Sequence, residues 1–430
     1  MNWEEWILSQ VEKRQSQQLF RSLHAVDLGS VECRTSSISK TNSNFALNDY
    51  LGLSSHPLVK SAASHAALAF GNGPRSSPLV GGYSGEHKIL EEMISKLKKT
   101  EDALLFSSGY AANTCLLSAL SAGGGVEIFS DELNHASIVD GIRLGGSCNR
   151  RDGTLMVYRH NDVGHLKRLL EDSYKRKSSN WRRIVVTDSL FSMDGDYAKL
   201  PEIVNLKREF PFLLIIDEAH ATLVCGENGG GAAEMFQVEH DVDIHLGTLS
   251  KAIGSQGGFI ACSRSMKSFI VNAGRSLIYS TALTVPSVVS AQVAIRIGQE
   301  EHWRREHLNS LSTQLFDYCV EHHKNIISPD AFLPSPIVVY GVDDPGQAMV
   351  VSKQLLSSHG MVVPGIRPPT VPSSRLRISL SALHTSTQVK ELMEALSSVD
   401  ICRGLNDDAT SSCGPETAPI CSRPVSKSRL

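Results

Sequence analysis

The stretch from Leu213 to Gly258 constrains this chain more than any other segment. It opens with the apolar run LLII, which ends on Asp217, and a second short apolar run near residues 243–246 is followed by Lys251 among glycines. Unbroken apolar runs of this length are typical of strands buried on both faces of a parallel sheet. Two such strands end at one edge of the sheet, so we expect Asp217, His220 and Lys251 to lie together there.

These three residue types indicate a particular chemistry. A carboxylate at the end of a buried strand costs free energy unless a cation meets it, and a lysine in a glycine-rich turn is suited to an anion or a carbonyl. Pyridoxal phosphate satisfies both groups, because its ring nitrogen binds an acid and its aldehyde binds an amine. Taken alone, the stretch also fits a chance Asp at a strand end and a surface Lys in a loop.

Length and composition set the remaining bounds. The chain has 430 residues, of which 41% are apolar and 20% charged, so we expect a globular protein of two or three domains. A net charge of −3 indicates neither a nucleic acid nor a membrane surface as partner. No apolar run reaches the roughly 18 residues of a membrane span, and MNWEEW lacks a secretory signal pattern. The nine scattered cysteines form no CxxC motif, which favours a reducing compartment and no metal site.

Strand-like and helix-like segments alternate through the first half of the chain. We expect helices over 86–100, 137–143, 163–173 and 202–209, and strands over 103–106, 126–130, 155–158, 184–187 and 213–216. This alternation predicts an α/β fold with a mostly parallel sheet, helices on both faces and a ligand at the carboxyl ends of the strands. The turn Ser107–Gly109 opens a helix and is a natural phosphate seat; without GxGxxG or a Walker lysine, it favours a phosphate smaller than a nucleotide.

The other segments divide the chain into four predicted parts. These are a helical arm over 1–45, a large domain over 46–285, a small α/β domain over 286–402 and a disordered tail over 403–430. Within them we expect helices over 2–24, 59–70, 266–272, 286–301, 303–323 and 387–396, strands over 45–53, 258–262, 337–340 and 375–380, and loops over 36–44 and 71–85.

Six motifs in a fixed order resemble one enzyme family. They are SSGYAAN (Ser107–Asn113), DELNHAS (Asp131–Ser137), DSLFSMDGD (Asp188–Asp196), DEAH (Asp217–His220), TLSKAIGSQGG (Thr248–Gly258) and RSLIYSTAL (Arg275–Leu283). Their spacing resembles the α-oxoamine synthases, which are fold-type I pyridoxal-phosphate transferases, and the resemblance covers about residues 2–400. It implies a large domain with a mostly parallel sheet covered by helices, a smaller C-terminal α/β domain, and a homodimer with shared active sites.

The resemblance also implies roles for individual residues. Lys251 would be the Schiff-base lysine and Asp217 the partner of the ring nitrogen, so that the ring accepts electrons from the substrate. The catalytic set is completed by His135, flat on the ring, and His220, near the 3-hydroxyl with Ser192. Further cofactor contacts would be Gly109, Tyr110 and Thr248 in the same chain and Ser280 and Thr281 from the neighbouring subunit. Alone, each histidine would also fit a core or loop residue.

Substrate contacts are implied in the same way. Arg377 would grip the α-carboxylate, because a guanidinium offers two parallel hydrogen bonds, and Arg21, Thr370 and His135 would lie nearby. Arg375 lies two residues from Arg377 on the same strand face, so the two can be confused. In the implied reaction an amino acid displaces Lys251, loses its Cα proton, attacks an acyl thioester, and the product then loses carbon dioxide.

The block Gly365–Thr385 is most similar to family members that join L-alanine to a pimeloyl thioester in biotin synthesis. Members that use glycine, such as 2-amino-3-ketobutyrate ligase and 5-aminolevulinate synthase, remain alternatives. A non-catalytic scaffold would normally have lost Lys251 or Asp217. The loop Gly73–Gly82 and the residues Ala221 and Leu223 depart from the glycine-richer family pattern, which affects the expected fit of the acyl chain.

The last three residues, Ser428, Arg429 and Leu430, match the small, basic, leucine pattern of a peroxisomal address. An exposed tail would make this address accessible to an import receptor. We therefore expect a peroxisomal protein, with the cytosol as the alternative if the tripeptide is a chance match.

Overall fold

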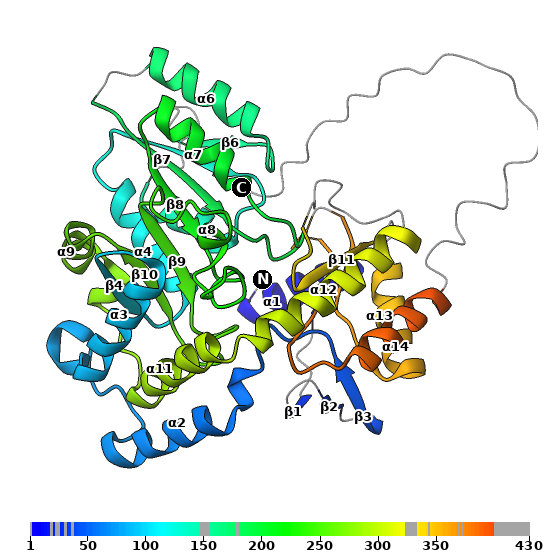
Figure 1. The fold of residues 1–430 in the computed structure, drawn as a ribbon. Helices are drawn as coiled ribbons and strands as arrows, with labels where there is room; N and C mark the ends of the chain where they lie inside the picture. Colours follow the sequence, from blue (N-terminus) through cyan, green and yellow to red (C-terminus); the bar gives the residue numbers. More distant parts are fainter. Residues whose placement is uncertain are drawn as a thin grey trace, which may run out of the picture.

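A computed structural model of the chain describes residues 2–17, 20–21, 26–29, 32–35, 38–146, 155–176, 180–322, 333–342, 345–368, 370–371 and 373–399. Within these residues, the largest sheet has the strand order β4-β10-β9-β8-β7-β5-β6 (Figure 1). Its strands are β4 (Asp102–Phe106), β5 (Val126–Asp131), β6 (Leu155–Tyr158), β7 (Arg182–Asp188), β8 (Leu213–Asp217), β9 (Ile244–Thr248) and β10 (Gly258–Cys262). Only β10 runs against its neighbours, which confirms the predicted, mostly parallel sheet.

Both faces of this sheet are buried. Along β7, Ile184 and Val186 belong to one hydrophobic core, whereas Val185 between them belongs to another. Because both faces are covered, the strands carry apolar residues on both sides, which explains apolar runs such as LLII in β8. One face packs on α4 (Gly109–Ser121), α5 (Ala136–Leu144), α9 (Arg264–Ala273) and α10 (Arg275–Ile278). The other packs on α2 (Pro57–Phe70), α3 (Gly85–Lys98), α6 (Val163–Arg176), α7 (Leu200–Glu209), α8 (Ala232–Met235) and α11 (Val285–Glu300).

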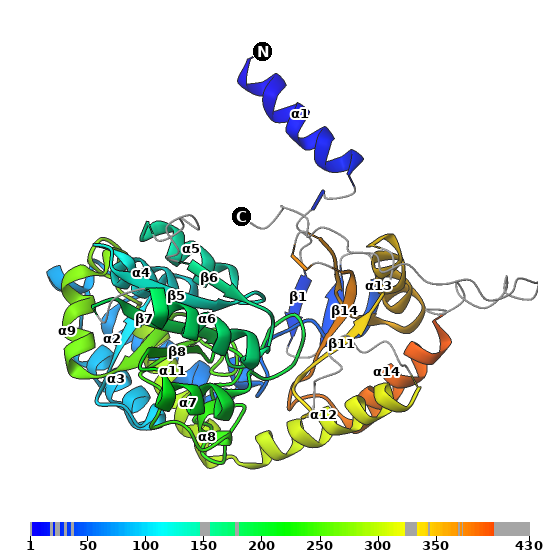
Figure 2. The same ribbon diagram turned by 90° about the horizontal axis from the view of Figure 1, so that it is seen from above.

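Two smaller sheets lie beside the large one (Figure 2). The first is antiparallel, with the order β11 (Ile337–Gly341), β14 (Arg375–Ser379) and β13 (Gly365–Ile366). The second joins β1 (Val26–Gly29), β2 (Glu32–Thr35), β3 (Ile38–Asn44) and β12 (Met361–Val362). Helices α12 (Trp303–His322), α13 (Pro345–His359) and α14 (Ser386–Ser398) complete this part. The predicted domain boundaries stay predictions. Helix α11, which falls in the predicted small domain, packs on α2 and α3 of the predicted large domain.

The N-terminal region differs from the predicted helical arm and polar loop. The predicted helix over 2–24 ends earlier, as α1 (Trp3–Ser16), and no α1 side chain is buried. Residues predicted as a polar loop instead form β3, because backbone bonds rather than apolar side chains hold its end: Ser43 N donates to the Gly360 oxygen (3.0 Å). β3 also pairs with β2, which precedes it directly in the chain, but its second partner, more than 300 residues away, leaves no local signal.

Residues 45–53 also differ from the predicted strand and turn. Residues 45–49 belong to no strand, and a 3-10 turn (η1) follows over Leu53–Ser55. Phe45 nevertheless bonds to two strands, with its N–H donating to Val362 and its carbonyl accepting from Ser379. Isolated bonds of this kind tie an extended segment down without making it part of a sheet.

The remaining element predictions are largely confirmed, with boundaries shifted by a few residues. Helix α13 was not predicted, and the predicted glycine-rich loop contains a π-type turn (η2) over Pro78–Gly82. The predicted tail over 403–430 lies outside the described residues. In the part of the chain that is described, no helix has the length and apolar character needed to cross a bilayer, and no group of side chains is arranged to hold a metal.

Candidate active site

The structure brings Asp217, His220 and Lys251 together at the carboxyl edge of the large sheet. Strand β8 ends on Asp217, and Lys251 follows the end of β9 by three residues. Lys251 Nζ lies 2.7 Å from His220 Nε2. Asp217 is buried and accepts hydrogen bonds from Asn113 Nδ2 (2.6 Å) and the Ala219 N–H (2.8 Å). Among the described residues it forms no ion pair, so its charge is available to a cationic ligand.

Burial favours the neutral forms of the Lys251 amine and the His220 imidazole. Removal from water lowers the pKa of Lys251 to about 8, although Asp217 and Asp188 oppose the shift. Burial, followed by the charge of Lys251, places the pKa of His220 well below its usual range. A neutral His220 beside an amine that titrates near neutrality suits proton transfer and attack on a carbonyl.

A continuous hydrogen-bond path connects Lys251 with Arg377. His220 Nδ1 lies 2.6 Å from the Tyr50 hydroxyl, which donates to Asn48 Oδ1 (3.2 Å). Arg377 Nη2 donates to the same Asn48 oxygen (3.1 Å). Sequence analysis did not assign Asn48 or Tyr50 to the site. The available signal was two polar side chains within the otherwise apolar segment FALNDYLGL.

The structure distinguishes Arg377 from Arg375. Arg375 Nη1 pairs with Asp194 Oδ1 at 2.6 Å, so its charge is already neutralised. Arg377 is equally buried but donates to neutral acceptors: the Ser192 carbonyl (2.6 Å), Ser379 Oγ (2.6 Å) and Asn48 Oδ1. Within the described residues it meets no carboxylate. A buried, unpaired guanidinium is costly unless an anion joins it, which favours Arg377 as the carboxylate anchor.

Gly109, Tyr110 and Thr248 meet at the start of α4. A Cβ atom on Gly109 would lie 3.3 Å from Thr248 Cβ, and one on Gly258 would lie 2.4 Å from the Gly109 nitrogen. Thr248 Oγ1 is 2.8 Å from Ser250 Oγ. Glycine is therefore required where β10 meets this turn, and the first amides of α4 lie beside two hydroxyls. Free N–H groups at a helix start and nearby hydroxyls suit a phosphate.

His135 is tied to Asp217 through two polar side chains. Its Nδ1 is 2.7 Å from Ser137 Oγ, and Asn113 Nδ2 donates to that oxygen (3.0 Å) as well as to Asp217. Burial lowers the pKa of His135, although Asp217 opposes the shift. A neutral ring is thus fixed beside the Asp217 carboxylate. The ring of Tyr110 meets His135 edge-on at a centroid distance of 6.4 Å.

Four predicted residues lie apart from this cluster. Arg21 Nη2 donates to Thr370 Oγ1 (2.7 Å), so these two predicted substrate contacts do meet each other. Thr281 lines an apolar cavity of about 280 Å³ with Ser107 and Leu283. Within the described residues, no hydrogen bond connects Ser280 or Thr281 with Thr248 or Lys251, and their predicted role lies in a second subunit.

The two departures at Ala221 and Leu223 fall in the core. Both side chains are fully buried, and Leu223 adopts φ 63°, a left-handed conformation that favours glycine. This conformation accounts for the expectation of a glycine-bearing turn there. The structure gives both residues a packing role in the hydrophobic core.

The observed groups fit pyridoxal phosphate. Asp217, buried and without an ion-pair partner in the described part, suits a protonated ring nitrogen, Lys251 suits the aldehyde, and the Gly109 turn suits the phosphate. His135, His220 and Ser192 would complete the ring site.

Comparisons with known proteins agree with this fit. The sequence profile of the aminotransferase class I and II family matches residues 40–396. The 8-amino-7-oxononanoate synthase of Arabidopsis thaliana is 45% identical over 396 residues, which are 88% of this chain and 78% of that protein. The chain belongs to this synthase family.

Solved structures of the same fold support the assignment. A serine palmitoyltransferase from S. paucimobilis with bound pyridoxal phosphate has a TM-score of 0.81 and 28% identity, covering 90% of this chain and 95% of that one. The 8-amino-7-oxononanoate synthase from Francisella tularensis has a TM-score of 0.70 and 27% identity, covering 83% and 97%. The protein is therefore a fold-type I, pyridoxal-phosphate-dependent acyltransferase of the 8-amino-7-oxononanoate synthase family, whose place is in biotin biosynthesis.

Proposed function

We propose that the enzyme condenses L-alanine with a pimeloyl thioester, pimeloyl-CoA in the simplest case, to give 8-amino-7-oxononanoate, coenzyme A and carbon dioxide. A bond forms between the alanine Cα and the acyl carbon, the thioester C–S bond breaks, and the carboxyl group leaves as carbon dioxide. The observation that carries the proposal is the buried Arg377, without a carboxylate partner in the described residues, at the far end of the path from Lys251.

Each residue has a distinct task in this reaction. When bound, pyridoxal phosphate supplies an electron sink for the pair released at the amino-acid Cα. Asp217, oriented by Asn113 and the Ala219 N–H, holds the ring-nitrogen proton. Lys251, with its pKa near 8, removes and returns the Cα proton, and His220 accepts a hydrogen bond from that amine.

Arg377 supplies the amino-acid end of the site. Its guanidinium donates to the Ser192 carbonyl, Ser379 Oγ and Asn48 Oδ1, which are all neutral acceptors, so a substrate carboxylate would supply its counter-charge. Replacing Arg377 by Ala is expected to weaken amino-acid binding by about 2–5 kcal/mol, because a buried charge pair is lost.

Paired substrate assays test the proposal. The purified holoenzyme is given alanine or glycine with pimeloyl-CoA or a short acyl-CoA, and coenzyme A release is measured. We expect the highest kcat/KM for alanine with pimeloyl-CoA. A higher value for glycine would contradict the proposal and favour the glycine-using members of the wider family.

We also propose a homodimer with shared active sites. Support comes from the exposed aromatic side chains of Trp3 (79% exposed) and Tyr279 (73%), and from Thr281, which is exposed and lines an apolar cavity. Mixing Lys251→Ala subunits with Ser280→Ala/Thr281→Ala subunits is the test. Because one site of each mixed dimer would be intact, activity should appear on mixing; if each chain carries a complete site, mixing adds nothing.

Finally, we propose that residues Ser428 to Leu430 direct the protein to the peroxisome through its import receptor. The support is the sequence of this tripeptide at the end of a polar tail. The alternative is the cytosol.

A further inference from the structure

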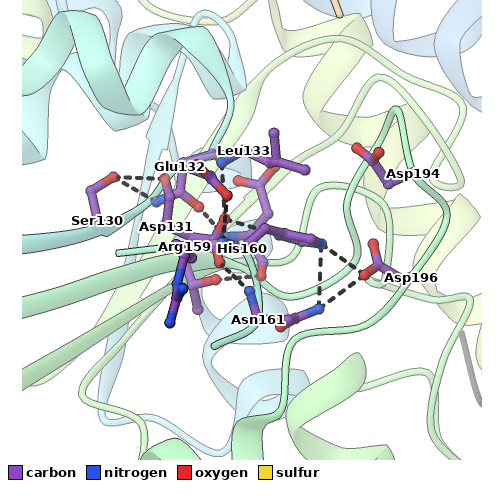
Figure 3. A network of polar contacts seen from close by, with 12 residues as sticks. Ser130, Asp131, Glu132, Leu133, Arg159, His160, Asn161, Asp194 and Asp196 are labelled. Atoms are coloured by element: carbon purple, nitrogen blue, oxygen red, sulfur yellow. Dashed lines mark hydrogen bonds and ion pairs between the residues drawn. The ribbon is translucent and has the colours of Figure 1, made fainter. Parts of the chain in front are cut away.

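A buried charged cluster lies at the carboxyl ends of β5 and β6, outside the residues assigned above (Figure 3). His160 Nδ1 is 3.0 Å from Asp131 Oδ1, and His160 Nε2 is 2.8 Å from Asp196 Oδ2. The two carboxylates are almost fully buried, with side-chain exposures of 1% and 2%. Asn161 reinforces the bridge, since its N–H donates to Asp131 Oδ2 (3.0 Å) and its Nδ2 donates to Asp196 Oδ2 (2.9 Å).

The geometry requires a charged imidazole. Each ring nitrogen faces a carboxylate oxygen, so both must donate, and only a protonated histidine has two N–H groups. Burial disfavours this charge, but the hydrogen bonds and charges of Asp131 and Asp196 outweigh it and raise the pKa of His160 to about 10. His160 therefore connects two buried anions that would otherwise be costly.

One end of this bridge supports the turn that carries His135. Asp131 is the last residue of β5, and its Oδ1 also accepts from the Leu133 N–H (2.9 Å). Asn134 then fastens the turn to β7, because its Oδ1 accepts from the Asp188 N–H (2.8 Å) and its Nδ2 donates to the Val186 carbonyl (2.8 Å).

The other end supports the loop over residues 189–198. Asp196 closes this loop through its backbone, since its carbonyl accepts from the Phe191 N–H (2.9 Å). The Phe191 ring meets His160 edge-on at a centroid distance of 4.4 Å. Tyr197 is fixed as well, because Asn161 Nδ2 donates to its carbonyl (3.0 Å). His160 and Asn161 thus contact the loop at three residues.

This loop holds both arginines of β14. The Ser192 carbonyl accepts from Arg377 Nε (2.6 Å), and Asp194 and the Met193 carbonyl bind Arg375 (2.6 and 2.7 Å). At Gly195, with φ 74°, a Cβ atom would lie 2.2 Å from the Ile337 carbonyl oxygen. The loop and β11 are therefore in close contact at Gly195. If the loop moved, the Ser192 carbonyl would no longer be in place to accept the hydrogen bond from Arg377.

We propose that His160 is a positioning residue: by bridging Asp131 and Asp196 it fixes the 189–198 loop, and through Ser192 it orients Arg377 for the substrate carboxylate. The inference rests on the proposed role of Arg377 as carboxylate anchor. His160 itself touches neither Lys251 nor Arg377 in the structure, so its effect should fall on amino-acid binding.

The first test compares His160→Leu with the wild-type holoenzyme. KM for the amino acid is expected to rise about tenfold or more, while KM for the acyl thioester changes less than about twofold. Because Ser192 and His135 also belong to the proposed ring site, the affinity for pyridoxal phosphate should fall, but by less than the affinity for the amino acid. His160→Gln, which keeps one donor, should fall between the two. The matched control is His165→Leu, because His165 Nδ1 accepts from the Arg159 N–H and, among the described residues, forms no hydrogen bond with the 189–198 loop. An unchanged amino-acid KM, or an equal loss for both substrates and the cofactor, would overturn the proposal.

The second test needs no substrate. Hydrogen exchange of the Phe191, Gly195 and Ala198 amides, which are all bonded within the loop, should accelerate about tenfold in His160→Leu, while the β8 amides keep wild-type rates. Unchanged loop exchange would contradict the proposal. Because this test measures the loop alone, its result stands even if the substrate assays show that the enzyme uses glycine and not alanine. If His160→Leu does not fold, Asp196→Asn carries the same expectations, because it keeps the side-chain shape and removes the charge.

Discussion

At the scale of single residues, burial determines which groups at the edge of the large sheet are charged. Asp217 keeps two hydrogen-bond donors, from Asn113 and Ala219, whereas Lys251 is removed from water next to a neutral His220. The carboxylate is thus held in place by hydrogen bonds, while the amine is close to losing its proton. Two consequences can be measured.

The first concerns Lys251. With a pKa of about 8, about one amine in ten is neutral at pH 7, and this reactive fraction grows as pH rises. Borohydride trapping of added pyridoxal phosphate on the apoprotein should therefore accelerate with a midpoint near pH 8, well below the usual lysine range. Lys251→Ala should trap no cofactor and have no turnover while keeping its fold; turnover near the wild-type level would exclude Lys251 from the reaction.

The second concerns Asp217. Asp217→Asn removes the anion that keeps the proton on the cofactor ring nitrogen but keeps the side-chain shape. Cofactor should remain bound, and exchange of the alanine Cα proton with deuterated solvent should slow by at least about a hundredfold. Exchange at the wild-type rate would show that Asp217 does not act on the ring nitrogen.

At the scale of elements, a buried ion pair between Lys98 and Glu218 stabilises the turn after β8. Lys98 of α3 donates to Glu218 Oε2 (2.6 Å), the Gly230 carbonyl (2.6 Å) and Thr222 Oγ1 (2.9 Å), and His245 of β9 meets the same carboxylate at 3.0 Å. Burial alone would raise the pKa of Glu218, but the charge of Lys98 and the bond to His245 lower it to about 2. This cluster fixes Glu218 between Asp217 and His220.

Lys98→Met should therefore destabilise the protein by about 3–5 kcal/mol, because Glu218 is left buried without its cation. Urea unfolding measures this loss. The control is Lys99→Met at the next position, whose pair with Glu239 is 46% exposed on the lysine side, so that about 1 kcal/mol or less is expected. Similar losses for the two variants would contradict the importance assigned to the buried pair.

The pH dependence of this stabilisation has a defined sign. The folded-state pKa of Glu218 lies below its ordinary value of 4.5, so its contribution is present above about pH 4.5 and is lost as the pH falls toward 2. The difference in unfolding free energy between wild type and Lys98→Met should shrink over this interval.

At the scale of the whole molecule, the site joins segments from both ends of the chain. Asn48 and Tyr50 come from the N-terminal part, Lys251 from the large sheet and Arg377 from β14, and the 189–198 loop holds the last of these in place. Any shift between the large and small sheets would break the path from Lys251 to Arg377.

The proposed peroxisomal address at residues 428–430 concerns the location of the whole molecule and does not depend on the active site. A fluorescent protein fused in front of residues 403–430 should appear in peroxisomes of eukaryotic cells, and the same fusion without Leu430 should be cytosolic. Diffuse fluorescence from the intact tail would exclude the peroxisomal address.

The sequence by itself determined the succession of strands and helices along the chain that forms the large sheet, and the grouping of Asp217, His220 and Lys251. It could do so because burial on both faces and helical periodicity are local properties, and parallel strands deliver their ends to one edge. Tertiary structure alone decided that Arg375 and not Arg377 has a carboxylate partner, and that β3 pairs with β12. It also decided that Asn48 and Tyr50 connect Lys251 with Arg377 and that His160 bridges two carboxylates. The physical reason is distance along the chain: Arg377 and Asn48 are 329 positions apart, so the contact exists only once the segment around Asn48 has bonded to β12 and β14.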